Sequence, residues 1–491
     1  MALFNSVGRP NKWRNTSIFN LCTPKQWKTI PTAQLKSEGY VVYGANGKIG
    51  FYDTFTHEKP TLMITCRGAT CGNIHLSEPN AYINGNAMAL DNLSPLVDVN
   101  YLRYFLKRFD FKGVISGSAQ PQITQKGMVG IDVALAPFPE QKRIVEKLDS
   151  LLAQVDTIQQ RLNNLPDIIK CFRQSVLAAA VSGKLTEQWR SENELKLTKS
   201  CISNAYKDGW ELEKLKEFEL KGKLPTNDKW KDKLPEPYKP DEEDLLRFGD
   251  FPKSWQFVSL DQITRFVKDG PHFSPTYSKS GVPFISGRNI SIDGISFETA
   301  KYISKELHEE LSRRCKPLFG DILYTKGGTT GIACVNREKL DFNVWVHVAV
   351  LRVSNHELIL PEYIQVALNS PKCFERAQSY THGVANRDLG LKRMIKICFP
   401  IPVFEEQTEI VRLVEQYFAL ADTLEKNLAN AKQRVDNLTQ SILAKAFRGE
   451  LVPQDLNDEP ADKLLARIKA ARLEAEKLEK AAKKAAKASK K

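Results

Sequence analysis

The chain of 491 residues lacks several features that would assign a protein to a class at once. No apolar run approaches the 18 or more residues of a membrane span, and the opening stretch MALFNSVGRPNKWRN has neither part of a secretion signal. The nine cysteines are scattered apart from Cys66 and Cys71, and none forms a CxxC pair or a cluster with zinc-ligand spacing. We therefore expect a cytoplasmic protein with reduced cysteines, no membrane contact and no metal site.

Signatures of catalysis are also missing. The sequence has no GxxxxGKS/T phosphate loop, no GxGxxG after a strand, no HExxH motif and no Asn-Pro-Pro-aromatic run for holding an extruded base. The stretch KGGTTG at 326–331 resembles a phosphate cradle only loosely, because it lacks the Lys-Ser/Thr ending. We expect a chain that binds rather than one that catalyses.

The positive charge is concentrated in three places. The net charge is +13. Roughly +6 falls on residues 1–139, roughly +6 on 251–400 and roughly +7 on the tail from 461, while the remainder carries about −6. The length exceeds what one hydrophobic core usually serves, so the sequence predicts two basic globular segments on a neutral-to-acidic frame, with a polyanion as partner.

One amphipathic segment occurs twice. Residues 140–188 align without a gap on residues 406–454, and roughly 17 of the 49 pairs are identical. In both copies apolar residues recur in steps of four and three, which predicts a helix with a heptad seam. The seam positions we predict are Ile144, Leu148, Leu151, Val155, Ile158, Leu162, Ile410, Val414, Leu424, Leu428, Val435 and Leu438.

A lone heptad stripe is unstable, so we expect the two helices to pack on each other as an antiparallel pair. The alternative is that each helix packs only on its own domain. Gly183 and Gly449 stand where C-terminal caps are expected, and Pro166 should disturb the first helix locally.

Each helix is preceded by short β-like runs and Gly-rich turns interleaved with basic and amide residues. Such turns suit nucleic acid, because small residues let the backbone approach phosphates while Arg, Asn and Gln pair with base edges. Taken singly, each of them fits a solvated surface or turn residue better, and it is the set as a whole that carries the prediction. The DNA-binding candidates are Asn46, Lys48, Arg67, Asn73, Gln120, Gln122, Arg288, Asn289, Lys326, Thr329, Thr330, Asn386, Arg387 and Lys392.

Several blocks closely resemble the DNA-specificity (S) subunits of bacterial Type I restriction-modification systems. They include VYGANGKIGFYD, GSAQPQIT and PFPEQKRIVEKLDSLLAQVDTI in the first half, and KPLFGDILYTKGGTTG and EEQTEIVRLVEQYFALADTLE in the second. The resemblance implies an α+β fold with two mixed α/β target recognition domains, at 1–139 and 251–404, separated by two long conserved helices packed as an antiparallel coiled coil. The helices span 140–183 and 405–449, with a charged, Pro-rich linker at 184–250 and a basic helical or frayed tail at 450–491.

The resemblance also implies a non-catalytic role and a set of partners. Each domain would read one half of a split asymmetric site on double-stranded DNA, and the helices would set the spacing and dock two modification (M) subunits. S-adenosylmethionine would belong to the M subunits, and ATP and Mg to the restriction (R) subunits. The competing hypotheses are a self-sufficient methylase or nuclease with an unfamiliar site, and a coiled-coil scaffold that binds nucleic acid without sequence preference. The tail is expected to be a solvated helix, with a DNA-backbone or M-subunit contact as the alternative.

Overall fold

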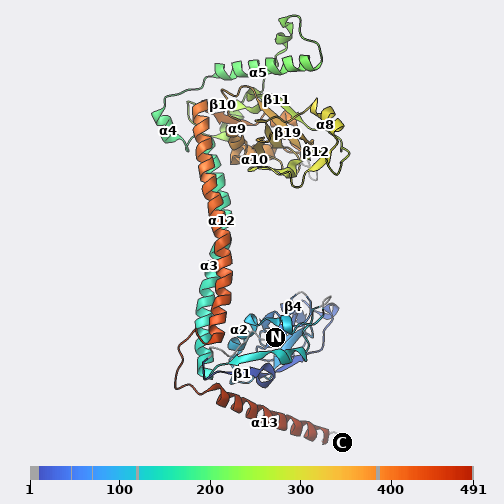
Figure 1. Ribbon diagram of the computed structural model, residues 1–491, viewed down its shortest axis with the longest axis vertical. Coiled ribbons are helices and arrows are strands. Elements are labelled where there is room, and N and C mark those ends of the chain that lie inside the picture. The colour runs from blue at the N-terminus through green and yellow to red at the C-terminus, as the bar shows by residue number, and fades with distance from the viewer. Residues whose placement is uncertain (1–9, 46, 69, 118–120, 383–387, 489–491) are drawn as a thin grey trace. The chain divides into compact units, whose positions relative to one another are not determined.

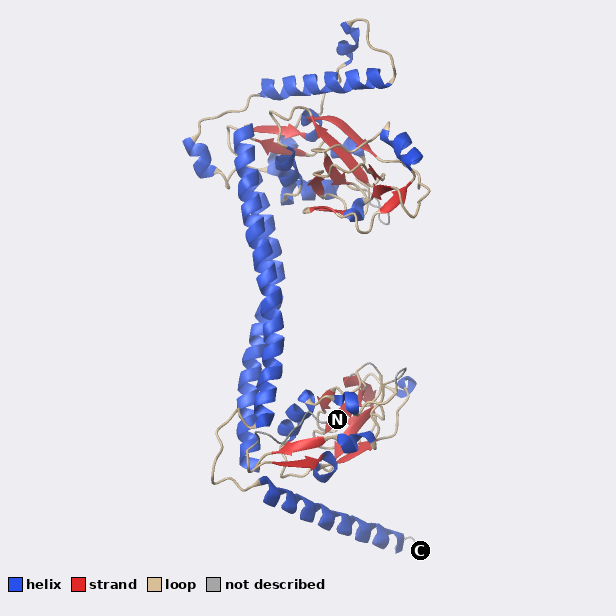
Figure 2. Cartoon of the chain, viewed as in Figure 1, coloured by secondary structure: helices blue, strands red, loops and turns tan. Residues whose placement is uncertain are grey.

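The computed structural model describes residues 10–45, 47–68, 70–117, 121–382 and 388–488, and the chain forms two compact units (Figures 1 and 2). Unit 1 contains Met1–Asn163 and Leu428–Lys491, and unit 2 contains Asn164–Asn427. Each unit holds one mixed domain and part of both long helices, α3 (Phe138–Val181) and α12 (Phe404–Arg448). The predicted α+β class is confirmed.

The domain of unit 1 consists of three small sheets. A two-stranded sheet has the order β1-β9, a four-stranded sheet the order β2-β8-β5-β6, and a three-stranded sheet the order β4-β3-β7 with β3 and β7 parallel. The strands are β1 (Arg14–Ser17), β2 (Thr23–Gln26), β3 (Tyr40–Gly44), β4 (Gly47–Tyr52), β5 (Leu62–Thr65), β6 (Ile74–Leu76), β7 (Tyr82–Ile83), β8 (Ala87–Asp91) and β9 (Asp132–Leu135). Helices α1 (Ile18–Leu21) and α2 (Val99–Arg108) and the short 3-10 turns η1 (Thr32–Gln34), η2 (Phe111–Gly113) and η3 (Gly127–Gly130) complete it.

The domain of unit 2 has the same sheets in the same order, with one extra hairpin. Its sheets are β10-β20, β11-β19-β16-β17 and β15-β12-β18, with β12 and β18 parallel, and the hairpin is β13-β14. The strands are β10 (Gln256–Ser259), β11 (Thr264–Asp269), β12 (Val282–Ile285), β13 (Ile290–Ser291), β14 (Gly294–Ile295), β15 (Lys301–Ile303), β16 (Ile322–Thr325), β17 (Ala333–Val335), β18 (Asn343–Val344), β19 (Val348–Val353) and β20 (Cys398–Ile401). Its helical elements are α7 (Leu260–Ile263), η5 (Gly287–Asn289), α8 (Lys305–Ser312), α9 (Pro361–Leu368), α10 (Pro371–Tyr380) and α11 (Leu391–Met394).

The central strands explain why two such different sequences share one topology. β5 reads LMIT and β16 reads ILYT, and every residue in both strands is buried. Apolar runs of this length, bounded by Gly-rich turns, fit strands covered on both faces. Alignment of the chain with itself finds the duplication in the long helices, whereas the sheet topology shows that the domains are duplicated as well.

Both long helices begin with a Glu-Gln pair that ties them to their domain. The side-chain amide of Gln141 accepts from the backbone N–H of Asp98 at 2.9 Å and donates to the carbonyl of Ala136 at 2.8 Å. Gln407 makes the matching bonds, accepting from Leu360 N–H at 2.8 Å and donating to the carbonyl of Pro402 at 2.9 Å. The repeated Glu-Gln motif is therefore a structural joint.

The helix ends also match. Gly183 and Gly449 have φ of +75° and +77°, as predicted for C-terminal caps. An added Cβ would lie 2.3 Å from Cγ of Pro252 at the first position and 2.3 Å from Cγ of Pro10 at the second. The backbone conformation and the close approach both require glycine. Helix α3 continues through Pro166.

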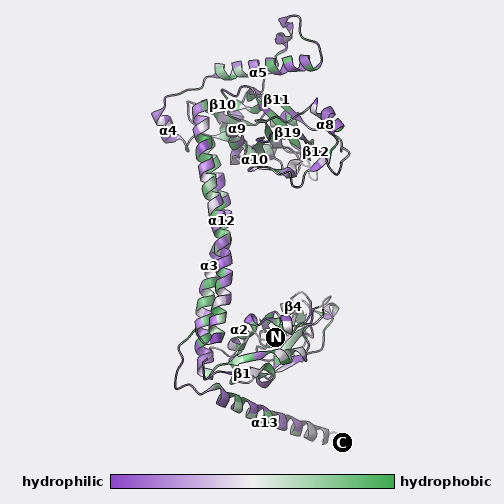
Figure 3. Ribbon diagram, viewed as in Figure 1, coloured by the Kyte–Doolittle hydropathy of each residue, from purple (hydrophilic) through white to green (hydrophobic). Residues whose placement is uncertain are grey.

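Within each unit, the parts of α3 and α12 run in opposite directions and pack together (Figure 3). In unit 1, Ile144, Leu148, Val155, Leu428 and Val435 are buried, and Leu151 and Leu162 are partly buried against the same core. In unit 2, Ile410 and Val414 are buried. Several of these residues belong to the same cores as the domains, so each helix packs on its domain as well as on the other helix.

Three predicted seam positions are wrong. Ile158, Leu424 and Leu438 are 43%, 45% and 45% exposed. An α-helix has 3.6 residues per turn, so a strict 3.5-residue pattern drifts by about 20° per heptad relative to a straight helix. Over helices of this length the drift carries some heptad positions out of the contact.

The expected linker is largely helical and belongs to unit 2. It contains α4 (Glu187–Glu192), α5 (Lys199–Leu220), η4 (Asp228–Lys233) and α6 (Glu242–Phe248). Ile202, Ala205, Tyr206 and Gly209 of α5 are buried, and α5 packs against β11 and α7. The last helix, α13 (Ala461–Ala488), belongs to unit 1.

Candidate nucleic-acid interface

Three loops of unit 1 converge at one end of its sheets. The carbonyl of Ala45, in the β3–β4 turn, accepts from the hydroxyls of Thr65 and Thr70 at 2.8 and 3.1 Å, which joins this turn to the β5–β6 turn. The backbone N–H of Gly68 donates to the carbonyl of Pro121 at 3.1 Å and adds the loop that precedes η3. Hydrogen bonds among the three loops fix their relative positions.

Unit 2 brings the equivalent loops together. The backbone N–H of Leu389 donates to the carbonyl of Lys326 at 2.8 Å, which joins the β16–β17 turn to the loop before α11. A Cβ on Gly287, in the turn after β12, would lie 3.1 Å from the carbonyl oxygen of Gly327. Arg288 therefore lies on a turn that contacts the β16–β17 turn. The two domains present three-loop clusters built on the same strands.

Most of the described candidates in unit 1 are available to a partner. Arg67, Asn73 and Gln122 are exposed, and an isolated bridge joins Arg67 to Gln122 across two of the loops. Lys48 is also exposed but forms an ion pair with Glu78 at 2.5 Å. A phosphate could compete for this lysine because the pair is solvated. Asn46 and Gln120 lie outside the described residues.

The candidates in unit 2 divide into exposed and buried residues. Arg288, Thr329 and Lys392 are exposed, and Lys392 lines a hollow of about 230 Å³ together with Tyr206 and Trp210. Asn289, Lys326 and Thr330 are only 3%, 3% and 5% exposed. Asn386 and Arg387 lie outside the described residues.

Lys326 is committed to carboxylates inside the domain, which corrects the expectation that it reaches DNA. Its Nζ lies 2.8 Å from Oδ1 of Asp388 and 3.5 Å from Oδ2 of Asp269. Asp269 is itself buried and pairs with Arg314 at 3.0 Å. A buried charge needs such partners. Lys326 therefore fixes the β16–β17 turn against the neighbouring loop, and no sequence motif distinguishes this role from phosphate binding.

Asn289 likewise has a structural role. Its Oδ1 accepts from the backbone N–H of Ser286 at 3.0 Å, and its Nδ2 donates to the carbonyl of Ser296 at 3.2 Å and to Oγ1 of Thr299 at 3.1 Å. These bonds use the amide groups that would pair with a purine edge. Asn289 shapes the turn that exposes Arg288.

The sequence analysis missed a basic group beside the loops of unit 1. Arg103 and Lys107 lie four residues apart on α2, which packs against β6. Burial, followed by the positive charges of Arg103 and Lys107, lowers the pKa of His75 on β6. His75 therefore stays neutral near neutral pH, and the local potential favours an anion. The i, i+4 spacing of the two basic residues was the available signal.

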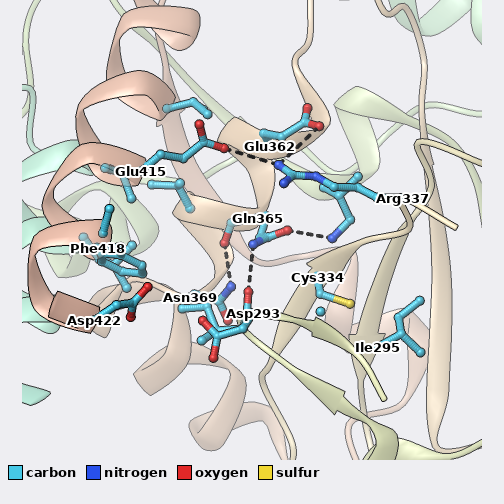
Figure 4. Close-up of a pocket in the computed structure, with 18 of the residues that line it drawn as sticks. Asp293, Ile295, Cys334, Arg337, Glu362, Gln365, Asn369, Glu415, Phe418 and Asp422 are labelled. Atoms are coloured by element: carbon cyan, nitrogen blue, oxygen red, sulfur yellow. Dashed lines mark hydrogen bonds and ion pairs between the residues drawn. The ribbon is translucent and has the colours of Figure 1, made fainter. Parts of the chain in front are cut away.

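A cavity of about 490 Å³ lies in unit 2 where α12 meets α9 and the β13–β14 hairpin (Figure 4). Asp293, Glu362, Glu415 and Asp422 line it, and Arg337 lies 3.4 Å from Glu415 and 3.8 Å from Glu362. At the corresponding junction of unit 1, the hydroxyl of Tyr104 donates to Asp149. The two junctions are filled differently, although the helices repeat.

Among the described residues, no helix is long and apolar enough to cross a membrane, and no group of three or more side chains could hold a metal ion. The family model of the Type I restriction modification DNA specificity domain matches residues 10–167 and 252–432, which contain the two domains and the first parts of both long helices. The chain therefore belongs to this family.

Comparison with individual proteins finds relatives of the same family. The specificity subunit of the Type I restriction enzyme EcoBI of Escherichia coli is 36% identical over 355 residues, which are 69% of this chain and 64% of that subunit. The EcoDI subunit of Escherichia coli is 29% identical over 479 residues, which are 91% of this chain and 96% of that subunit. The HsdS subunit of Thermoanaerobacter tengcongensis shares the fold with a TM-score of 0.51 at 17% identity, covering 91% of this chain and 99% of that one.

Proposed function

We propose that this chain is the sequence-reading subunit of a Type I restriction-modification complex, in which each domain reads one half of a split asymmetric target on double-stranded DNA. The matched pair of three-loop clusters carries the proposal. Each cluster holds exposed residues of the kind that pairs with base edges, Arg67 and Gln122 in unit 1 and Arg288 in unit 2. Two readers of one topology but different sequence suit a target with two unlike halves.

The long helices would set the distance between the halves. If both domains enter the major groove from one face of the duplex, the centres they read lie about one helical turn apart, roughly 34 Å. The helices can hold such a distance because they are continuous and packed on each other within each unit.

The same helices would dock two M subunits. Tyr417, Leu420 and Leu424 of α12 are 36%, 50% and 45% exposed and lie on one face at spacings of three and four residues. Apolar side chains left exposed on a helix that is already paired favour a further partner. S-adenosylmethionine and adenine methylation would belong to the M subunits, and ATP, Mg, translocation and cleavage to the R subunits. This chain would be required for both activities without supplying a catalytic group.

Selection of bound duplexes from a random library by the chain with its M subunits tests the reading role. We expect one split motif. Arg67→Ala should relax bases in one half only and Arg288→Ala bases in the other half only, each at a cost of about 1–3 kcal/mol, so each variant is the control for the other. A wild-type selection without a motif, or a variant that relaxes both halves, contradicts the proposal.

The docking role has its own test. Leu420→Glu with Leu424→Glu should weaken association with the M subunits at least tenfold, whereas Leu246→Glu, at an 84% exposed position on α6, should leave it unchanged. Equal effects of the two changes would contradict docking on this face of α12.

A further inference from the structure

The turn between β18 and β19 joins the loop cluster of unit 2 as a fourth segment. It consists of Trp345, Val346 and His347. The backbone N–H of Lys326 donates to the carbonyl of His347 at 2.9 Å. A Cβ on Gly327 would lie 2.1 Å from Nδ1 of His347, so the imidazole packs directly on the β16–β17 turn. The β18–β19 turn is therefore fixed to the cluster through both its backbone and a side chain.

The loop that follows β11 rests on this turn and exposes an aromatic ring. A Cβ on Gly270 would lie 1.8 Å from the carbonyl oxygen of Val344, so the loop runs directly against the end of β18. The indole N–H of Trp345 donates to the carbonyl of Phe273 at 3.3 Å. Phe273 itself is 53% exposed. The hydrogen bond holds the backbone of the loop in place while the phenyl ring stays available to a partner.

Unit 1 fills the equivalent place with polar groups. Its β7–β8 turn reads NGN at 84–86, where unit 2 has Trp-Val-His. Asn84 is 1% exposed, and its side chain accepts from the backbone N–H of Ile30 and donates to the carbonyl of Ile30, both at 3.1 Å. Lys28 and Thr29, which precede Ile30 in the loop after β2, are exposed. The two clusters therefore differ in chemistry at the same position, apolar in unit 2 and polar in unit 1.

We propose that Phe273 is a specificity-determining residue that contacts the 5-methyl group of a thymine in the half-site read by unit 2, a role that rests on the proposed function for the presence of DNA. The methyl group of thymine is the apolar feature that base edges present in the major groove, and phenylalanine is among the side chains that contact it. The loop of Phe273 is tied to the turns that carry Arg288, so both side chains belong to one reading surface.

Deoxyuridine in place of thymine tests this contact, because it removes the methyl group and leaves every hydrogen-bonding group of the base unchanged. The full chain with its M subunits is bound to its selected target, with deoxyuridine in the half that Arg288→Ala relaxes. Phe273→Ala is compared with Phe319→Ala, a matched control that is 63% exposed. Phe319 precedes β16, whereas the reading turn follows it, so the control lies at the opposite end of the strand. Thermal unfolding checks that both variants are folded.

We expect deoxyuridine to weaken binding of the wild type about fourfold, the effect of burying one methyl-sized group. Phe273→Ala should weaken binding of the thymine target about fourfold or more and lose the response to deoxyuridine, whereas Phe319→Ala should bind as the wild type does. A phenyl ring wedged between base pairs would instead give a weakened Phe273→Ala variant that still responds to deoxyuridine.

That result overturns the proposal, as does a half-site without thymine or a wild type that is indifferent to deoxyuridine. In each of these three cases the split motif is still selected, so the reading role stands and only the thymine contact fails. A selection that yields no split motif overturns the proposed function and the contact with it.

Discussion

The indole N–H of Trp13 donates a hydrogen bond to Oε2 of Glu140 at 2.9 Å. Trp255 makes the same bond to Glu406 at 2.8 Å. The segment that follows one long helix also bonds to the glutamate that begins the other, through Gln454 to Glu140 in unit 1 and through Arg190 to Glu406 in unit 2. Each joint thus connects a domain, the start of one helix and the segment after the other.

Glu140 makes the first joint sensitive to pH. Burial raises the pKa of this carboxyl, against the opposing hydrogen bonds from Gln454 and Trp13. The folded state therefore binds the proton more tightly than the unfolded state, so this group contributes less to stability as pH rises from the ordinary pKa through the raised one. Glu140→Gln removes the titration. We expect the free energy of unfolding of the wild type, relative to that variant, to fall as the pH rises above the ordinary pKa of a glutamate, about 4.3, in urea titrations. A rise would contradict the prediction.

The glycines at the helix ends give a stability prediction with an internal control. Gly183→Ala and Gly449→Ala impose a positive φ on alanine and place its Cβ against a proline, so each should lower the free energy of unfolding by about 2–4 kcal/mol. Gly222 has a φ of +64° and open space around its Cβ position, so Gly222→Ala should cost only about 1–2 kcal/mol. If all three variants lose the same free energy of unfolding in urea titrations, the contacts with the prolines are unimportant.

Substitutions of Lys326 and Arg288 should have opposite effects on stability and on DNA binding. Lys326→Met leaves the buried Asp269 with fewer partners and should lower the stability of unit 2 by about 3 kcal/mol. Arg288→Ala, at an exposed position, should change stability by less than about 0.5 kcal/mol and weaken binding of the target DNA. Thermal unfolding and target binding, measured on both variants, check the pair. A stable Lys326→Met variant that loses only DNA binding would restore Lys326 as a direct contact.

The helices make a prediction about the gap in the target. One heptad is inserted near the middle of α3 and one near the middle of α12. The insertions preserve the packing pattern and lengthen each helix by about 10 Å. The unspecified gap should lengthen by about three base pairs while the bases read stay the same. Selection from a random duplex library measures both. An unchanged gap would exclude the helices as the element that sets the spacing.

The sequence was most informative where structure follows from local pattern. The duplicated heptads predicted both long helices, and the two glycines predicted their ends, because side-chain spacing and positive φ are local properties. The β-like runs expected before each long helix contain strands for the same reason, among them β3, β5 and β16. Family resemblance supplied the arrangement of the domains.

Burial at the loops could not be predicted. Lys326, Asn289 and Thr330 lie in polar, Gly-rich stretches that look exposed, yet contacts with residues distant in sequence bury them. Asp269 and Asp388 reach Lys326 only after three strands have paired. Helix α5 was hidden for a similar reason, since its buried face is short and the surrounding composition resembles a linker.

A single-molecule map of adenine methylation in the host genome tests the central claim most directly. It is recorded with this chain present and with the chain deleted, leaving the partner subunits intact. The account predicts that deletion removes methylation from one split asymmetric motif and that restoring the chain restores it. Retention of that motif in the deletion strain, in cells whose M subunits remain active, would contradict the account.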